Sequence, residues 1–160
     1  MASIENAAVI FADGTTNKSL DEQRLIVARW QHDDWAELFR RAEALPIGAG
    51  RVLIQKDAAE RALFFVASGL LEVTAVLTGQ TMATIAKINP GSVVGELAFL
   101  DGKPRSAKVW AVTDSTLYRL EYDAYLRFAD DHPALACELV FGIGRLVAMR
   151  LRRMMASSGR

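Results

Sequence analysis

The sequence has few of the residues that bind metals or form disulfides. It contains one cysteine, Cys137, and two histidines, His32 and His132. A single cysteine cannot form an internal disulfide, so a reducing, cytoplasmic location is expected. The histidines lie far apart without further ligands at metal-binding spacing, and neither has the context of a catalytic triad. The sequence therefore predicts no metal site and no enzyme, and it predicts that Cys137 is a small buried side chain in an apolar helix.

Charge of one sign and long apolar runs are also lacking. The chain has 19 Lys and Arg against 19 Asp and Glu, which gives a formal net charge of zero. Because nucleic-acid binding usually requires an excess of cations, nucleic acid is not an expected partner, and an anionic ligand needs a local site. Apolar stretches such as Ala62–Leu71 are too short for a membrane span, and the N-terminus lacks the basic segment of a secretion signal.

What the sequence does have is enough apolar material for one core, since 51% of its 160 residues are hydrophobic. Residues 1–18 show no sustained period and are expected to form a flexible arm. Residues 19–43 are predicted to form two helices. The first lies near 20–31, and the second begins at Asp33 or Asp34 and continues towards Pro46.

Residues 44–121 change to a period of about two, which is typical of β-strands. The predicted strands are 52–54, 62–67, 70–77, 82–88, 107–112 and 116–120. Short strands separated by Gly, Pro, Asn and Asp predict an antiparallel sandwich or jelly roll, not alternating strands and helices. Residues 122–155 return to helical spacing, with a short helix at 122–129 and a long one from Pro133, where proline suits the first helical position.

One connection between strands, residues 94–107 with the sequence VGELAFLDGKPRSA, has the elements of an anion site. Gly95 allows a tight turn, and the residues from Glu96 are strong helix formers, so amide groups at this helix start lack intrahelical acceptors. Arg105 follows the φ-restricting Pro104. Arg105 suits a phosphate and Glu96 a hydroxyl group of the same ligand, but a structural Glu96–Arg105 salt bridge explains the pair equally well.

The same segment resembles the phosphate-binding cassette of the cyclic-nucleotide-binding domain family, and the resemblance extends over roughly residues 30–155. It implies a mainly β protein: an antiparallel β-roll (jelly-roll type) with N-terminal helices, a short cassette helix and a long C-terminal helix. It implies that Arg105 binds the cyclic phosphate and that Glu96 binds the ribose 2′-OH. The ligand-binding set that it implies is Val94, Gly95, Glu96, Leu97, Ala98, Arg105, Ser106 and Ala107.

The resemblance favours cAMP over cGMP as ligand, although the Ser106 hydroxyl leaves guanine open, and it implies no other cofactor. The sequence departs from the family pattern at residues 55–62, where members of the family usually have glycines. The C-terminal helix is expected to act as a lid, with Phe141, Leu146 and Val147 as candidates, but packing of this helix against its own β-roll explains each of these side chains equally well. Four arginines towards its end, Arg145, Arg150, Arg152 and Arg153, are expected to be solvated, with contact to an anionic partner as the alternative.

The chain is expected to be one ligand-binding domain without an effector domain, which acts on an unknown effector protein. A homodimer through the C-terminal helix is open. The alternative function is a β-roll that no longer binds ligand and serves as an interaction or dimerisation module.

Overall fold

Two four-stranded antiparallel sheets form the centre of the chain, in a computed structural model that describes residues 3–13, 23–76, 79 and 81–159. The first sheet has the strand order β1 (Glu43–Ile47), β8 (Ser115–Glu121), β3 (Ala62–Ser68) and β6 (Val93–Val94). The second sheet has the order β2 (Val52–Ile54), β7 (Lys108–Ala111), β4 (Leu71–Val76) and β5 (Met82–Ile88). The predicted antiparallel β-roll is confirmed.

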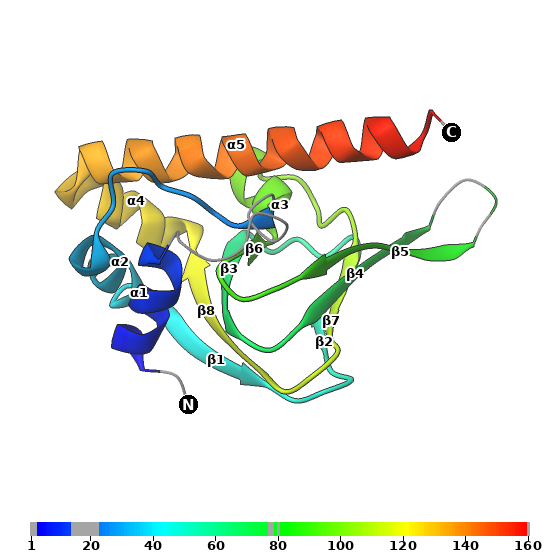
Figure 1. The fold of residues 1–160 in the computed structure, drawn as a ribbon, viewed down its shortest axis with the longest axis horizontal. Coiled ribbons are helices and arrows are strands. Elements are labelled where there is room, and N and C mark those ends of the chain that lie inside the picture. The colour runs from blue at the N-terminus through cyan, green and yellow to red at the C-terminus, as the bar shows by residue number, and fades with distance from the viewer. Residues whose placement is uncertain (1–2, 14–22, 77–78, 80, 160) are drawn as a thin grey trace.

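Helices cover one end and one side of this roll (Figure 1). They are α1 (Ile4–Ala12), α2 (His32–Phe39), α3 (Glu96–Asp101), α4 (Tyr122–Asp131) and α5 (Pro133–Ser157). Helix α3 is the predicted cassette helix. Helix α5 runs along the molecule and passes over α3, which places its C-terminal half beside the cassette.

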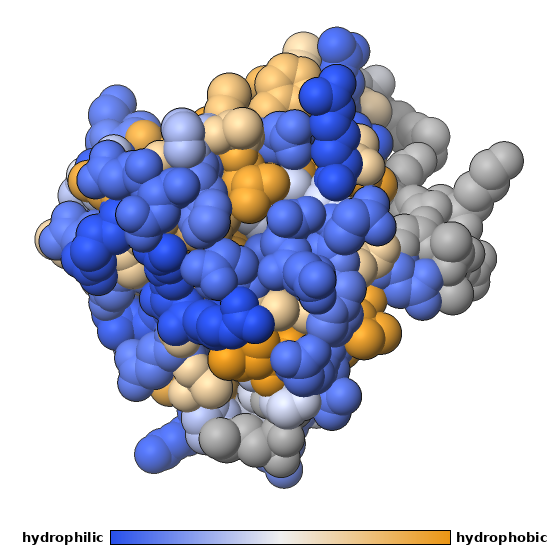
Figure 2. Space-filling model, turned by 90° about the vertical axis from the view of Figure 1, so that its left-hand side faces the viewer, coloured by the Kyte–Doolittle hydropathy of each residue, from blue (hydrophilic) through white to orange (hydrophobic). Residues whose placement is uncertain are grey.

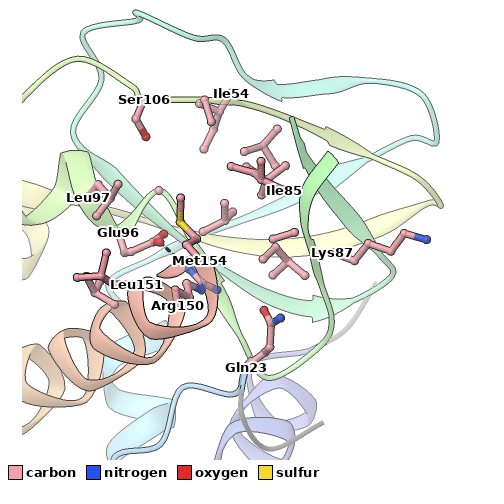
Figure 3. A pocket seen from close by; sticks show the side chains of 18 of the residues that line it. Gln23, Ile54, Ile85, Lys87, Glu96, Leu97, Ser106, Arg150, Leu151 and Met154 are labelled. Carbon is pink, nitrogen blue, oxygen red and sulfur yellow. Dashed lines mark ion pairs between the residues drawn. The ribbon is translucent and has the colours of Figure 1, made fainter. Parts of the chain in front are cut away.

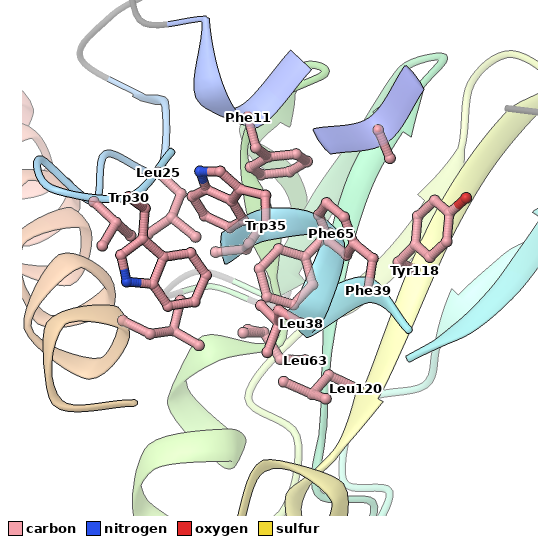
Figure 4. Close-up of a cluster of buried hydrophobic side chains, with 14 of the residues drawn as sticks. Phe11, Leu25, Trp30, Trp35, Leu38, Phe39, Leu63, Phe65, Tyr118 and Leu120 are labelled. Atoms are coloured by element: carbon pink, nitrogen blue, oxygen red, sulfur yellow. The ribbon is translucent and has the colours of Figure 1, made fainter. Parts of the chain in front are cut away.

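Strand β3 is buried on both faces and divides the core into two clusters. Leu63, Phe65 and Ala67 face the helices, whereas Phe64 and Val66 face the second sheet. Side chains alternate between the faces of a strand, so an uninterrupted apolar run is what a strand between two packed layers requires. The helical cluster is rich in aromatic side chains from α1, α2, β3 and β8 (Figure 4). This cluster fixes the helices against the roll that carries the cassette.

Residues 1–18 were predicted to form a flexible arm. This prediction is wrong for Ile4–Ala12, which form helix α1. The Ser3 hydroxyl caps this helix by accepting a hydrogen bond from the Asn6 amide. Phe11 is buried against the rings of Trp35, Phe39 and Phe65. A helix of this length is unstable alone, so packing against α2, which a local pattern does not reveal, stabilises it. Residues 14–18 lie outside the described residues.

Replacement of Phe11 tests whether α1 belongs to the core. We expect Phe11→Leu to lower the free energy of unfolding by about 1 kcal/mol, because the aromatic contacts are lost while most of the apolar volume remains. Val9→Ala is the control, since Val9 lies on the same helix with 52% of its surface exposed. Urea denaturation of both variants measures the difference, and equal stability of the two would contradict a packed α1.

The two predicted N-terminal helices also need correction. Residues 23–31 contain no α-helix, and residues 20–22 of the first predicted helix lie outside the described residues. Helix α2 ends at Phe39, and Glu43–Ile47 form strand β1 instead of continuing the helix. Strand β1 pairs with β8 at the edge of the first sheet, where Pro46 can be accommodated without a ladder hydrogen bond. Pairing with a distant strand therefore overrides the local helical pattern.

The surface at the helical end is mainly hydrophilic, with small apolar patches (Figure 2). Cys137, near the start of α5, is exposed, so the prediction of a buried cysteine is wrong. Its neighbour Ala136 takes the buried position on that turn. None of the helices that the structure describes is long and apolar enough to cross a membrane.

Candidate functional site

A cavity of about 820 Å³ lies between the cassette, the second sheet and the C-terminal end of α5 (Figure 3). Its apolar wall comes from strands of the roll, through Ile54, Val73, Ile85, Ile88 and Val109. All eight predicted ligand-binding residues line it: Val94, Gly95, Glu96, Leu97, Ala98, Arg105, Ser106 and Ala107. An apolar pocket with a few convergent polar groups is the usual form of a small-molecule site.

Gly95 is the residue that begins the cassette helix. It has a φ of 86° and forms the N-cap of α3, a left-handed conformation that residues with a Cβ atom rarely adopt. The first hydrogen bond of this turn runs from the Phe99 amide to the Gly95 carbonyl, at 3.2 Å. Helix geometry leaves the amides of Glu96, Leu97 and Ala98 without intrahelical acceptors. These amides are donors at the edge of the cavity.

Arg105 is a buried cation beside this turn, with 2% of its surface exposed. Its Nη1 donates to the Gly95 carbonyl at 3.0 Å and its Nη2 to the Ala62 carbonyl at 2.8 Å. Nη2 also lies 3.6 Å from a Glu60 carboxylate oxygen. Burial lowers the pKa of the Arg105 guanidinium, and the Glu60 carboxylate acts in the opposite direction. Within the described part of the chain, the Nε of Arg105 has no hydrogen-bond partner.

The turn at residues 55–62, where the sequence departs from the family pattern, surrounds this arginine. The Asp57 amide donates to the Arg105 carbonyl at 2.8 Å, and the Arg105 amide donates to the Ala58 carbonyl at 2.9 Å. Asp57 has a φ of 68°, a left-handed conformation that aspartate tolerates better than most residues. The turn thus holds the Arg105 backbone without the glycines that are usual in the family.

Glu96 pairs with Arg150 of α5, not with Arg105. The Arg150 Nη1 and Glu96 Oε1 atoms are 2.6 Å apart, and the two side chains are 17% and 12% exposed. The structural Glu96–Arg105 salt bridge that the sequence left open is therefore not the arrangement found. Arg150 was expected to be solvated, and this expectation is wrong. The sequence shows the periodicity of α5 but not the distant carboxylate against which one of its arginines packs.

The three lid candidates lie in different surroundings. Val147 lines the cavity, Leu146 is buried in the helical core, and Phe141 is 78% exposed and away from the cavity. The α5 residues that line the cavity are Val147, Arg150, Leu151, Arg153, Met154 and Ser157. Sequence reasoning missed Leu151 and Met154 as cover for the cavity. Their apolar spacing near the end of α5 was the available signal.

Buried polar atoms without partners are concentrated at this cavity. Among the described residues, five buried side-chain atoms have no hydrogen-bond partner, and three of these belong to lining residues: Gln23 Oε1, Arg105 Nε and Arg150 Nε. Buried polar atoms are normally paired, so this concentration indicates a place for a polar ligand. No group of three or more His, Cys, Asp or Glu side chains in the described part of the chain could hold a metal ion.

The sequence matches the pattern of a known protein family, and known proteins are similar to it over much of its length. The pattern of the "Cyclic nucleotide-binding domain" family matches residues 45–132, which include the whole cassette. Glutaminase 2 of Bradyrhizobium diazoefficiens is 28% identical over 88% of this chain and 22% of its own length. The Cyclic AMP receptor protein of Thermus thermophilus is 33% identical over 64% of this chain and 46% of its own length. The chain thus spans less than half of these relatives.

The fold has solved counterparts as well. A cyclic nucleotide-binding domain from Methylobacillus flagellatus superposes with a TM-score of 0.79 over 94% of this chain and 79% of that one, at 19% identity. This likeness concerns the fold, and the family pattern in the sequence supplies the assignment. Because that pattern covers more than half of the 160 residues, the chain belongs to the cyclic nucleotide-binding domain family.

Proposed function

We propose that this chain is a sensor module that binds a purine 3′,5′-cyclic nucleotide, with cAMP favoured over cGMP, in the cavity beside α3. The observation that carries the proposal is Arg105, a buried guanidinium that faces a cavity and keeps one donor without a partner. Burying a charge is unfavourable unless it is paired. An anion in the cavity would complete the pairing that Glu60 provides only in part.

The phosphate is proposed to bind between Arg105 and the start of α3. The guanidinium keeps free donor positions after its bonds to the Gly95 and Ala62 carbonyls, because it has five N–H groups. The amides of Leu97 and Ala98 supply further donors. One cation, two amides and the Ser106 hydroxyl suit a compact phosphate with a single charge, which is the form that a cyclic phosphate presents.

The ribose is proposed to bind at Glu96, whose ionised carboxylate can only accept hydrogen bonds. A 2′-OH is a donor of the required kind, and Glu96 lines the same cavity as Arg105. The base then faces the apolar wall of Ile85 and Ile88 on one side and the end of α5 on the other. The name of the Thermus thermophilus relative, Cyclic AMP receptor protein, supports adenine as the base and cAMP as the ligand.

Titration calorimetry with cAMP, cGMP and 5′-AMP tests the proposal. We expect saturable binding of a cyclic nucleotide and much weaker binding of 5′-AMP, because the extra charge and open phosphate do not match a site with one main cation. Absence of binding of either cyclic nucleotide at millimolar concentration would overturn the proposal. It would then favour the alternative of a roll that acts as an interaction module.

The lid part of the proposal has its own prediction. We expect the double variant Leu151→Ala/Met154→Ala to bind cyclic nucleotide about tenfold more weakly, because the base loses apolar cover from α5. Phe141→Ala is the matched control, since Phe141 lies on the same helix but away from the cavity. If calorimetry gives the double variant the same affinity as the control, these residues do not cover the base.

A further inference from the structure

Gln23 is a polar side chain that the segment before α2 contributes to the cavity beside α3 (Figure 3). Its Oε1 atom is buried and has no hydrogen-bond partner among the described residues. We propose that Gln23 determines the base preference of the site by accepting a hydrogen bond from the 6-amino group of adenine. The proposal rests on the proposed function and deepens it, because it names the residue that distinguishes cAMP from cGMP.

Contacts with the turn between β5 and β6 hold the Gln23 backbone in place. The Ser92 hydroxyl donates to the Gln23 carbonyl, and the Leu25 amide donates to the Gly91 carbonyl at 3.0 Å. The Arg24 guanidinium lies against the same turn, so closely that a Cβ atom at Gly91 would be 2.9 Å from its Cζ atom. The backbone that carries Gln23 is therefore fixed relative to the wall of the cavity.

Gln23 lies at the end of the cavity that the base is proposed to occupy. In the view of Figure 3, Gln23 and Ser106 are at opposite ends of the cavity, and Gln23 is near β5 and the end of α5. The side chains of α5 proposed to cover the base, Leu151 and Met154, are apolar and offer no hydrogen bond to its polar edge. A polar partner for the base must therefore come from another element, and Gln23 provides one.

Three other polar side chains that line the cavity are less suited to this role. Lys87, Asn89 and Ser157 are exposed, so water can bond to their polar groups. Lys87 also points away from the cavity in Figure 3, and the Ser157 hydroxyl donates to the Met154 carbonyl at 2.9 Å. The Oε1 atom of Gln23 differs because it is buried and unpaired, which is unfavourable until a donor reaches it.

The atom that Gln23 presents favours adenine over guanine. A carboxamide oxygen accepts hydrogen bonds and cannot donate them. Adenine carries an amino group, which is a donor, at position 6, whereas guanine carries an acceptor oxygen there. With the amide oriented as in the structure, guanine bound in the same way would place two acceptor oxygens against each other. Glutamine is also a common partner of the adenine 6-amino group in nucleic-acid recognition.

A ligand without the 6-amino group separates this role from a packing role. The 3′,5′-cyclic monophosphate of purine riboside is cAMP without that group. We expect calorimetry to show that wild-type protein binds cAMP about tenfold more tightly than this ligand, because one hydrogen bond is lost. We expect Gln23→Met to weaken cAMP binding about tenfold and binding of the purine riboside ligand less than about twofold. The discrimination between the two ligands should therefore nearly disappear.

Two further variants serve as controls. Gln55→Met is the same substitution at an exposed residue that does not line the cavity, so the discrimination should remain. Gln23→Glu keeps an acceptor at the same place, and although its negative charge should weaken both ligands, cAMP should still bind more tightly. Thermal unfolding establishes that each variant is folded. If Gln23→Met does not fold, lack of discrimination in wild-type protein or in Gln23→Glu still contradicts the proposal.

The outcomes are distinct from those that test the proposed function. Equal weakening of both ligands in Gln23→Met would show that Gln23 only packs against the cavity wall. Tighter binding of cGMP than of cAMP by wild-type protein would show that Oε1 does not select adenine. Each of these results overturns the inference, while binding of either cyclic nucleotide upholds a cyclic-nucleotide sensor. If wild-type protein binds neither cyclic nucleotide, both fail together.

Discussion

Arg105→Gln is expected to reduce the affinity for cyclic nucleotide at least about a hundredfold, as measured by calorimetry. Glutamine keeps a polar side chain of moderate length but removes the charge and the fork of donors. The phosphate then enters a cavity in which its main cation is missing, and an unpaired buried charge is strongly unfavourable. The loss should exceed that of any other single change in the cassette, because the phosphate carries the ligand's charge.

Arg119→Gln is the control for this variant. Arg119 donates to Glu60 through Nε at 3.1 Å and Nη2 at 2.7 Å, so it belongs to the same ion-pair network, but it does not line the cavity. Its replacement removes an equal charge from Glu60 while the phosphate site stays intact. Folding of Arg105→Gln is expected because Glu60 keeps Arg119 as a partner. Wild-type affinity in Arg105→Gln would show that the ligand binds elsewhere.

The cassette could be predicted from sequence because its parts are close together in the chain. Glycine at the turn, helix formers after it, and an arginine behind a proline are local features, and the family pattern joins them. The part of the site that α5 contributes could not be predicted in this way. Arg150, Leu151 and Met154 reach the cavity only because α5 lies along the roll, and that placement depends on the packing of Leu139, Ile143 and Leu146 in the helical core.

The incorrect predictions for α1 and β1 have the same physical origin, which is dependence on contacts between segments far apart in the sequence. Helix α1 and strand β1 owe their stability to partners far away in sequence, namely the aromatic cluster and strand β8. The hydrophobic periodicity of a segment indicates which face of a helix or strand is apolar, but it does not indicate which other element covers that face. The strands of the roll were easier to predict from the sequence, since alternating apolar and polar residues and turn residues recur there at short intervals.

Gly95→Ala is expected to disrupt the phosphate site without a change of charge. A Cβ atom at this position would lie 2.6 Å from Nη1 of Arg105 and 3.0 Å from the Ala62 carbonyl oxygen. Because Arg105 is buried and bonded to both Gly95 and Ala62, it cannot move aside freely. We expect a loss of about 2–4 kcal/mol in the free energy of unfolding and at least a tenfold loss, on the order of 1.4 kcal/mol, in ligand affinity.

Gly50→Ala separates the clash from the backbone conformation. Gly50 has a φ of 80°, close to the 86° of Gly95, but no heavy atom lies within 4 Å of a Cβ atom built there. Its replacement should therefore cost only the left-handed conformation, about 1–2 kcal/mol, and leave ligand affinity unchanged. Urea denaturation and calorimetry of the two variants measure the two effects. If Gly95→Ala behaves like Gly50→Ala in both, close approach of the Gly95 backbone to the Arg105 guanidinium does not control the position of that guanidinium.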